Sequence, residues 1–145
     1  MGIRQGDPLS PLLFGLVMKK VLSEVECKWQ RRGYGTPVGE SERGIRLTHV
    51  AFVDDVTLIA HSRTTLKRMI LELRACLEKY GLKLHPSNCK VQCNVNTNVC
   101  RGDVEIETGF SVNVLPAESG LKILGTMLHF DRHSTPEVKY RVATA

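Results

Sequence analysis

The chain has 145 residues, of which 42% are hydrophobic, and its 20 Lys and Arg against 15 Asp and Glu give a formal net charge of +5. This length suits one domain, and the mild basic excess favours a partner that bears phosphate. The longest apolar run, residues 12–18, is far shorter than the roughly 20 residues of a membrane span. We therefore expect no membrane segment and an intracellular protein.

The five cysteines form an odd set without paired C-x2-C spacing. This usage predicts reduced thiols, as in an intracellular protein. A metal site is the alternative, because four potential ligands lie close in sequence: His85, Cys89, Cys93 and Cys100. The spacing of the three thiols fits no common zinc pattern, and strand-like alternation explains the first two as core residues.

The first predicted element is a helix over residues 11–27. Ser10 is the expected N-cap, and Pro11 is the expected first helical residue, where its missing N–H costs nothing. The first two turns are apolar all round, whereas charged residues appear later. We therefore expect the N-terminal end of this helix to be the more deeply buried one.

Residues 29–46 are rich in Gly and charge and show neither helical nor strand periodicity, which predicts a surface loop. Its basic and aromatic side chains could contact a nucleic-acid backbone, although a solvated loop is the preferred interpretation. These side chains are Arg31, Arg32, Tyr34 and Arg43.

Two apolar and β-branched runs, residues 45–53 and 56–61, predict strands that form a hairpin around Asp54 and Asp55. Residues 64–80 then carry the clearest helical periodicity, and Gly81 is placed to end that helix. Its apolar stripe predicts that it packs on one face of a sheet.

The rest of the chain predicts further strands. Residues 90–100 alternate apolar with polar side chains, as in a half-exposed strand. Residues 104–108 and 111–115 are weaker strand candidates, and residues 121–128 form a short apolar stretch with a bend at Gly125. We expect the last dozen residues to be frayed.

The pair Asp54 and Asp55 has two interpretations, a hairpin turn or a metal site. Asp is common in turns. Consecutive side chains of a strand point to opposite faces, so two adjacent carboxylates can converge on one metal only where the backbone turns sharply. Because the expected turn lies at this position, the pair could bind Mg²⁺, which prefers carboxylate and phosphate oxygens.

A second stretch that can carry chemistry is "GIRQGDPLSPLLF", residues 2–14. Gly6 allows a ligand to approach the backbone closely, and Arg4 and Gln5 offer hydrogen-bond donors. The residues alone leave open whether this is a ligand-binding loop or a plain entry into the helix.

Four stretches together resemble the reverse transcriptases of non-LTR retrotransposons and group II introns. "GIRQGDPLSPLLF" is similar to the RQGxPLSP motif of that family, and "FVDD" is similar to its catalytic hairpin. "GLKLHPSNCKV" and "LKILG" resemble two later motifs, GLxxNxxKT and YLG. The four occur in family order between residues 2 and 125.

This resemblance implies an RNA-directed DNA polymerase palm in which Asp54 binds catalytic Mg²⁺, with Mn²⁺ as a possible substitute, and Asp55 supports the same site. Phe52 would support the hairpin beneath the primer end. The implied reaction is attack of a DNA primer 3′-hydroxyl on the α-phosphate of a deoxynucleoside triphosphate, directed by an RNA template.

The resemblance also implies a nucleotide pocket lined by Gln5 and Gly6, with Arg4 close by. The third motif departs from the family, since Asn88 stands where a Lys that protonates the pyrophosphate leaving group is usual. Lys90, two residues on, would face the same side of a strand and is the expected substitute.

The fold class implied is α+β, a polymerase palm fragment. We expect an antiparallel sheet that contains the hairpin of residues 45–61, with the two helices packed on one face. Residues 1–130 would form the C-terminal part of the palm, with a thumb-side hairpin near residues 121–130 and a frayed tail over residues 131–145.

The family's other essential Asp lies on a strand before the RQG motif. We therefore expect the upstream palm and the fingers to belong to a longer polyprotein, and this chain to be inactive alone. Its expected location is nuclear if it functions. The alternative is a remnant of a retroelement that binds nucleic acid without catalysis.

Overall fold

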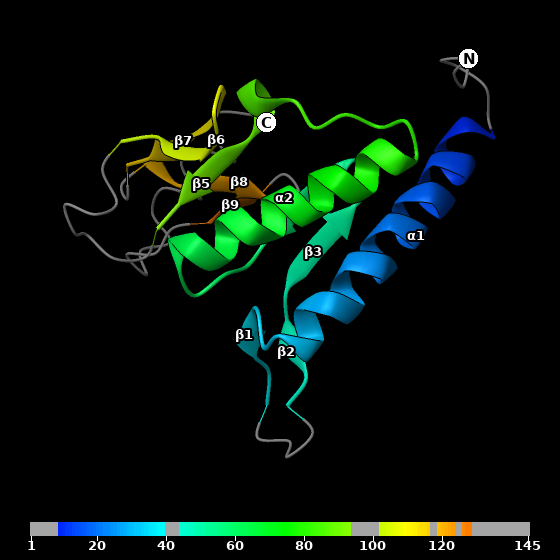
Figure 1. Cartoon of the computed structure of the whole chain (residues 1–145), viewed down its shortest axis with the longest axis horizontal. Helices are drawn as coiled ribbons and strands as arrows, with labels where there is room; N and C mark the ends of the chain where they lie inside the picture. The colour runs from blue at the N-terminus through cyan, green and yellow to red at the C-terminus, as the bar shows by residue number, and fades with distance from the viewer. Residues whose placement is uncertain (1–8, 40–43, 94–101, 117–118, 124–125, 129–145) are drawn as a thin grey trace. The chain divides into compact units, whose positions relative to one another are not determined.

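The computed structural model of the chain describes residues 9–39, 44–93, 102–116, 119–123 and 126–128. These residues form two compact units, Met1–Leu84 and His85–Ala145, and each is treated separately below. Helices and small sheets occur together, so the fold is α+β, as the sequence predicts (Figure 1). In the part of the chain that the structure describes, no helix is long and apolar enough to cross a membrane.

The first unit contains two helices and two short sheets. Helix α1 covers Ser10–Arg31 and α2 covers Arg63–Lys79. Strand β1 (Thr36–Pro37) pairs with β2 (Arg46–Leu47), and β3 (His49–Phe52) pairs with β4 (Asp55–Leu58), both antiparallel. The predicted hairpin and the second predicted helix are therefore present at the expected positions.

Helix α1 corrects three expectations. It continues to Arg31 instead of ending at residue 27, and its N-cap is Leu9, whose side chain makes no capping hydrogen bond, rather than Ser10. The expected burial of its N-terminal end is wrong as well. Four leucines there are 47% to 62% exposed, namely Leu9, Leu12, Leu13 and Leu16.

The reason for the last error is the position of the partner helix. The residues of α1 that are buried recur at helical spacing in its middle and C-terminal parts: Met18, Val21, Leu22, Val25 and Trp29. This stripe faces the buried residues Met69, Leu73 and Leu77 of α2. Hydrophobicity all round a helix indicates where burial is possible, whereas the amphipathic stripe shows where it occurs.

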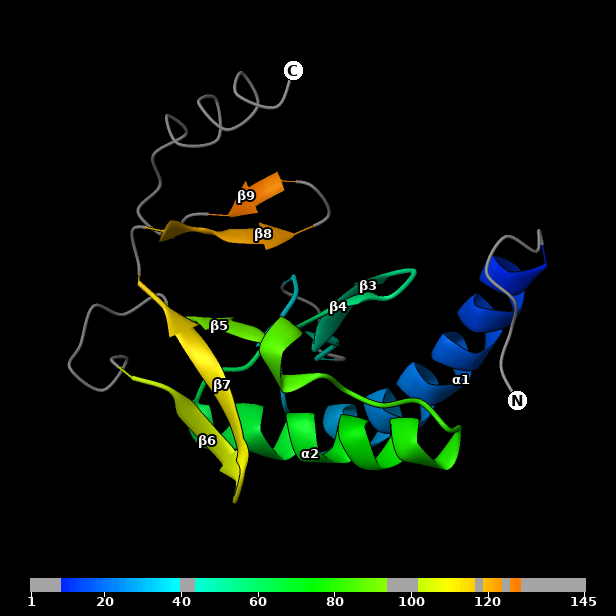
Figure 2. The same cartoon turned by 90° about the horizontal axis from the view of Figure 1, so that it is seen from above.

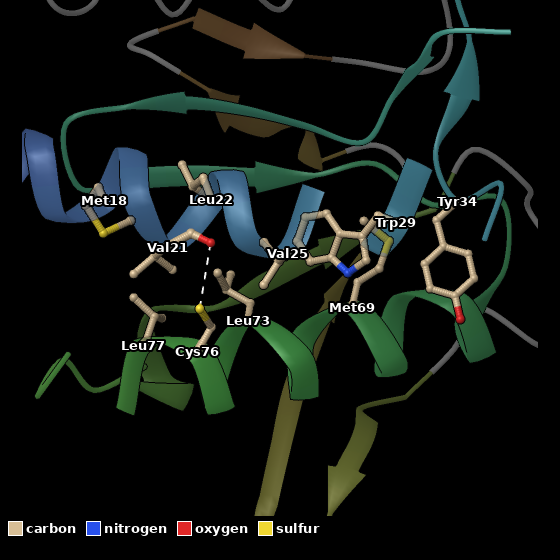
Figure 3. Close-up of a cluster of buried hydrophobic side chains, with 10 residues drawn as sticks. All are labelled: Met18, Val21, Leu22, Val25, Trp29, Tyr34, Met69, Leu73, Cys76 and Leu77. Atoms are coloured by element: carbon tan, nitrogen blue, oxygen red, sulfur yellow. Dashed lines mark hydrogen bonds between the residues drawn. The ribbon is translucent and has the colours of Figure 1, made fainter. Parts of the chain in front are cut away.

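The core of the first unit lies between the two helices and the β3–β4 hairpin (Figures 2 and 3). Val21, Val25, Trp29 and Met69 have no exposed surface. Partly buried side chains of the hairpin, including Val56 and Leu58, pack against this cluster. Full burial of each large apolar side chain stabilises the fold by about 1.5–3 kcal/mol, so this cluster dominates the packing of the unit.

The segment 29–46 is only in part the surface loop that its composition predicts. Trp29 and Tyr34 are buried, at 0% and 8% exposure, although β1 is exposed. The Gln30 amide bonds the Arg46 backbone in both directions, since its Nε2 donates to the carbonyl at 2.7 Å and its Oε1 accepts from the amide at 3.2 Å. These bonds close the segment against the end of α1.

Gly35 is required where the segment closes. Its φ is +81°, and a Cβ at this position would lie 2.4 Å from the Leu47 carbonyl oxygen. Such a contact requires the backbone of Leu47 and Thr48 to move. Glycine therefore permits both the left-handed conformation and the close approach of the two strands.

The second unit contains a three-stranded sheet and a hairpin. A 3-10 turn over Pro86–Asn88 precedes β5 (Lys90–Gln92), and β6 (Val104–Glu107) and β7 (Phe110–Leu115) follow. The order is β5-β7-β6, with β5 parallel to β7 and β6 antiparallel to it. The last hairpin joins β8 (Leu121–Ile123) and β9 (Thr126–Leu128).

This unit confirms the strands expected near residues 104–108 and 111–115, and the two strands of the stretch 121–128. The strand expected over residues 90–100 is described only as β5, since residues 94–101 lie outside the described residues. The parallel β5–β7 pair makes this sheet mixed, whereas the antiparallel pairing expected for the hairpin of residues 45–61 is present between β3 and β4.

We predict that Gly35→Ala lowers the free energy of unfolding by about 3 kcal/mol, because strain at positive φ adds to a backbone clash. Gly39→Ala is the matched control. Its φ is +74°, but a Cβ there would meet nothing within 4 Å, so a loss of about 1 kcal/mol is expected. Urea denaturation followed by tryptophan fluorescence measures both, and equal losses would contradict the contact with Leu47.

Candidate functional site

The turn of the β3–β4 hairpin contains the candidate catalytic carboxylates. Phe52 pairs with Asp55, so only Val53 and Asp54 lie between the paired strands. Val53 has a φ of +54° and is the only non-glycine residue with positive φ in the described part of the chain. A β-branched residue rarely adopts this conformation, and it costs about 1–3 kcal/mol. The backbone therefore turns sharply at the position that a shared metal site requires.

The two faces of this hairpin differ in character. On one face, Val56 and Leu58 of β4 pack against the core of the first unit. Because side chains alternate along a strand, Asp55 lies on the other face, directly opposite Phe52. Asp54 and Asp55 are exposed, and the Phe52 side chain is 64% exposed. Two carboxylates are thus presented to solvent by a hairpin whose reverse face is packed.

The base of the hairpin is fixed to the core. Thr48 is 1% exposed, and its carbonyl accepts a 2.8 Å hydrogen bond from the amide of Ile59. The adjacent His49 ring meets the Trp29 indole edge to face, with 6.0 Å between ring centroids. Burial lowers the pKa of His49, although the charge of Glu26 acts in the opposite direction. The contact between His49 and the buried Trp29 ring therefore anchors the base of the hairpin to the core.

The other predicted site residues do not form one described constellation. Arg4, Gln5 and Gly6 lie outside the described residues. Lys90 is the exposed first residue of β5 in the second unit. Asn88 belongs to the preceding 3-10 turn, so the expectation that Asn88 and Lys90 share a strand face is wrong, because the strand begins only at Lys90.

The sequence does not reveal that Arg32 belongs to a polar cluster in the first unit. Arg32 forms an ion pair with Glu72, which raises the pKa of the guanidinium, and its Cζ lies 6.0 Å from the centre of the Tyr34 ring. The second oxygen of Glu72 accepts a 3.0 Å hydrogen bond from the Trp29 indole N–H. No sequence signal joins these residues, since 40 positions separate Arg32 from Glu72.

A second polar cluster ties α1 to the end of α2. Glu24 accepts a 2.6 Å hydrogen bond from the Tyr80 hydroxyl and lies 3.5 Å from the Cys76 sulfur. The bonds from Tyr80 and Cys76 lower the pKa of Glu24, and the same Glu24 contact raises the pKa of Tyr80. Burial raises the pKa of the Cys76 thiol, which also donates to the Val21 carbonyl at 3.7 Å (Figure 3). These hydrogen bonds hold α1 against the C-terminal end of α2.

Comparison with known proteins identifies the family. The chain matches the reverse transcriptase (RNA-dependent DNA polymerase) family over residues 1–128, and it belongs to that family. The four motifs in family order are therefore explained by membership.

Two curated relatives are retrotransposon polyproteins. The chain is 36% identical over 88 residues to the Retrovirus-related Pol polyprotein from type-1 retrotransposable element R2 of Nasonia vitripennis. It is also 36% identical over 89 residues to that from type-2 retrotransposable element R2DM of Drosophila melanogaster. Each match covers 61% of this chain but only 8% of the polyprotein.

A third relative is an uncharacterized mitochondrial protein of Arabidopsis thaliana, 39% identical over 56 residues, which are 39% of this chain and 45% of that protein. No solved structure matches the chain.

The lowered pKa of His49 predicts that stability falls in mild acid. The folded state disfavours the charged ring, so the unfolded state binds more protons below about pH 6.5. The free energy of unfolding should therefore be highest above that pH and decrease as pH falls toward the lowered pKa. Urea denaturation at pH 7.5, 6.5 and 5.5, followed by Trp29 fluorescence, measures the slope.

His49→Gln should flatten this slope, because it removes the half-buried titrating ring. His61→Gln is the control, since His61 is exposed. A slope that is unchanged in His49→Gln, or flattened equally in His61→Gln, would show that His49 is not its source.

Proposed function

We propose that this chain is part of the palm of a retrotransposon reverse transcriptase and that its β3–β4 hairpin carries catalytic carboxylates. The observation that supports this most directly is the sharp turn at Val53, which lies between the paired strands β3 and β4 and presents Asp54 and Asp55 to solvent. Family membership supplies the reaction class, transfer of a deoxynucleotide to a primer 3′-hydroxyl on an RNA template.

The donor atoms at the turn fit Mg²⁺, which prefers hard carboxylate oxygens and completes its octahedral shell with water and substrate phosphates. Within the described ranges, no group of three His, Cys, Asp or Glu side chains could hold a metal ion. The two carboxylates therefore account for only part of a metal site. When bound, Mg²⁺ or Mn²⁺ would supply Lewis-acid activation of the attacking hydroxyl and of the phosphate.

The residues of the chain have distinct proposed roles. Asp54, in the turn itself, would bind the ion directly, and Asp55 would hold the same site from the outer face of β4. Phe52, opposite Asp55, would support the primer end, a role consistent with its exposed position.

The remaining roles concern template and nucleotide. Gln5 and Gly6 would line the nucleotide pocket with Arg4 beside it. These assignments rest on the family motifs. A nuclear location likewise stays a prediction.

A non-catalytic role in nucleic-acid binding is the second candidate. The observation in its favour is that only two carboxylates gather at the hairpin in the described part of the chain. It predicts binding that weakens steeply with salt and that does not depend on Asp54.

We predict that Asp54→Asn weakens binding of Mn²⁺ to this chain at least about fivefold, because half of the carboxylate oxygens of the site are lost. Water-proton relaxation during a Mn²⁺ titration measures the affinity. Asp103→Asn is the matched control, since Asp103 is also exposed and its substitution removes the same negative charge. Equal affinity in the two variants would contradict a metal site at the turn.

Catalysis is best tested in a chimera in which residues 1–128 replace the homologous segment of the Nasonia polyprotein. Primer extension on an RNA template with Mg²⁺ should be lost about a thousandfold or more in Asp54→Asn, as expected for loss of an ion-binding carboxylate. The Asp103→Asn chimera should retain parental activity. Extension by Asp54→Asn at the parental rate would refute the assignment.

A further inference from the structure

The first unit contains an open hollow of about 600 Å³. None of the residues that line it belongs to the β3–β4 hairpin. Four residues line it: Arg32, Tyr34, Arg68 and Glu72. The first two follow the end of α1, and the other two lie one turn apart on α2. The segment 29–46 thus joins a neighbouring helix to form a defined surface.

The charges in this hollow do not cancel. Both oxygens of Glu72 are engaged, one by Arg32 and the other by the Trp29 indole. Arg68 is exposed, and among the described residues no carboxylate forms an ion pair with it. The positive charge of Arg68 is therefore left uncompensated. Arg32, which also lines the hollow, has further N–H donors besides the one that bonds Glu72.

Arg32 is held in a geometry that suits an oxyanion. Its guanidinium carries five N–H donors in a planar fork, so it can bond Glu72 and a second group at once. The buried Tyr34 ring lies beside this fork, with 6.0 Å between its centroid and Cζ. The Arg46 side chain in turn donates hydrogen bonds to the carbonyls of Tyr34 and Gly35, at 3.1 and 3.0 Å, which fixes the backbone at Tyr34.

We infer that this hollow binds a phosphate group, with Arg68 and the free donors of Arg32 as its ligands. Planar guanidinium forks match phosphate oxygens, and charge-assisted hydrogen bonds are the stronger class. The volume exceeds that of a phosphate alone, so the group can be part of a nucleic-acid backbone or of a free phosphate ester. The site is independent of the proposed catalytic hairpin.

Trp29 makes the inference testable in the intact chain, because it is the only tryptophan and its indole N–H bonds Glu72. A phosphate that draws on Arg32 changes the charge next to the indole. We expect a saturable change in Trp29 emission when the chain is titrated with inorganic phosphate or with an abasic deoxyribose-phosphate oligomer, which lacks quenching bases. Tighter binding of the oligomer identifies a strand as the source, and equal affinity per phosphate identifies a free ester.

Two variants with the same change in net charge separate a built site from general attraction. Arg68→Gln should weaken binding of either probe about tenfold, as expected for loss of a charged hydrogen bond. Lys19→Gln should weaken it less than about twofold, since Lys19 is exposed on α1 and does not line the hollow. Equal losses in the two variants, or the absence of a saturable signal, would overturn the inference.

Discussion

Burial of the Trp29 indole is the interaction on which the first unit depends. The side chain has no exposed surface, and the residue contacts α2, β3 and the segment that follows α1. Its N–H bonds Glu72 of α2, its ring meets His49 of β3, and its carbonyl accepts a 3.0 Å hydrogen bond from the Tyr34 amide. A tryptophan can be buried this deeply because its one polar atom has a partner. The side chain of Trp29 therefore joins α1 to α2 and to the hairpin, and its backbone carbonyl holds the segment after α1.

This arrangement explains how an unfavourable turn can persist. Positive φ at Val53 costs free energy that the turn itself cannot recover, because its own side chains are exposed. Strand β4 offsets this cost, since its Val56 and Leu58 pack against the helical core. Strain of this kind is often retained where function constrains the backbone, which is consistent with the role proposed for Asp54 and Asp55.

The sequence predicted those features that depend on neighbours in the chain. Helix α2, the β3–β4 hairpin and the last strands follow from periodicity over a few residues, and the family follows from four short motifs. The errors concern features set by distant partners. The exposed leucines at the start of α1 and the burial of Tyr34 both depend on where α2 lies, and no local pattern encodes that position.

The same distinction applies to the two proposed sites. The carboxylates of the hairpin are adjacent in sequence, so a motif can reveal them, whereas Arg32 and Glu72 come together only through packing of the helices. Packing of one face also fixes the register of the hairpin. A shift of register by one residue would bring Asp55 into the core and expose Val56, because side chains alternate with a period of two. The packing that stabilises this hairpin therefore also fixes which side of it presents a carboxylate to solvent.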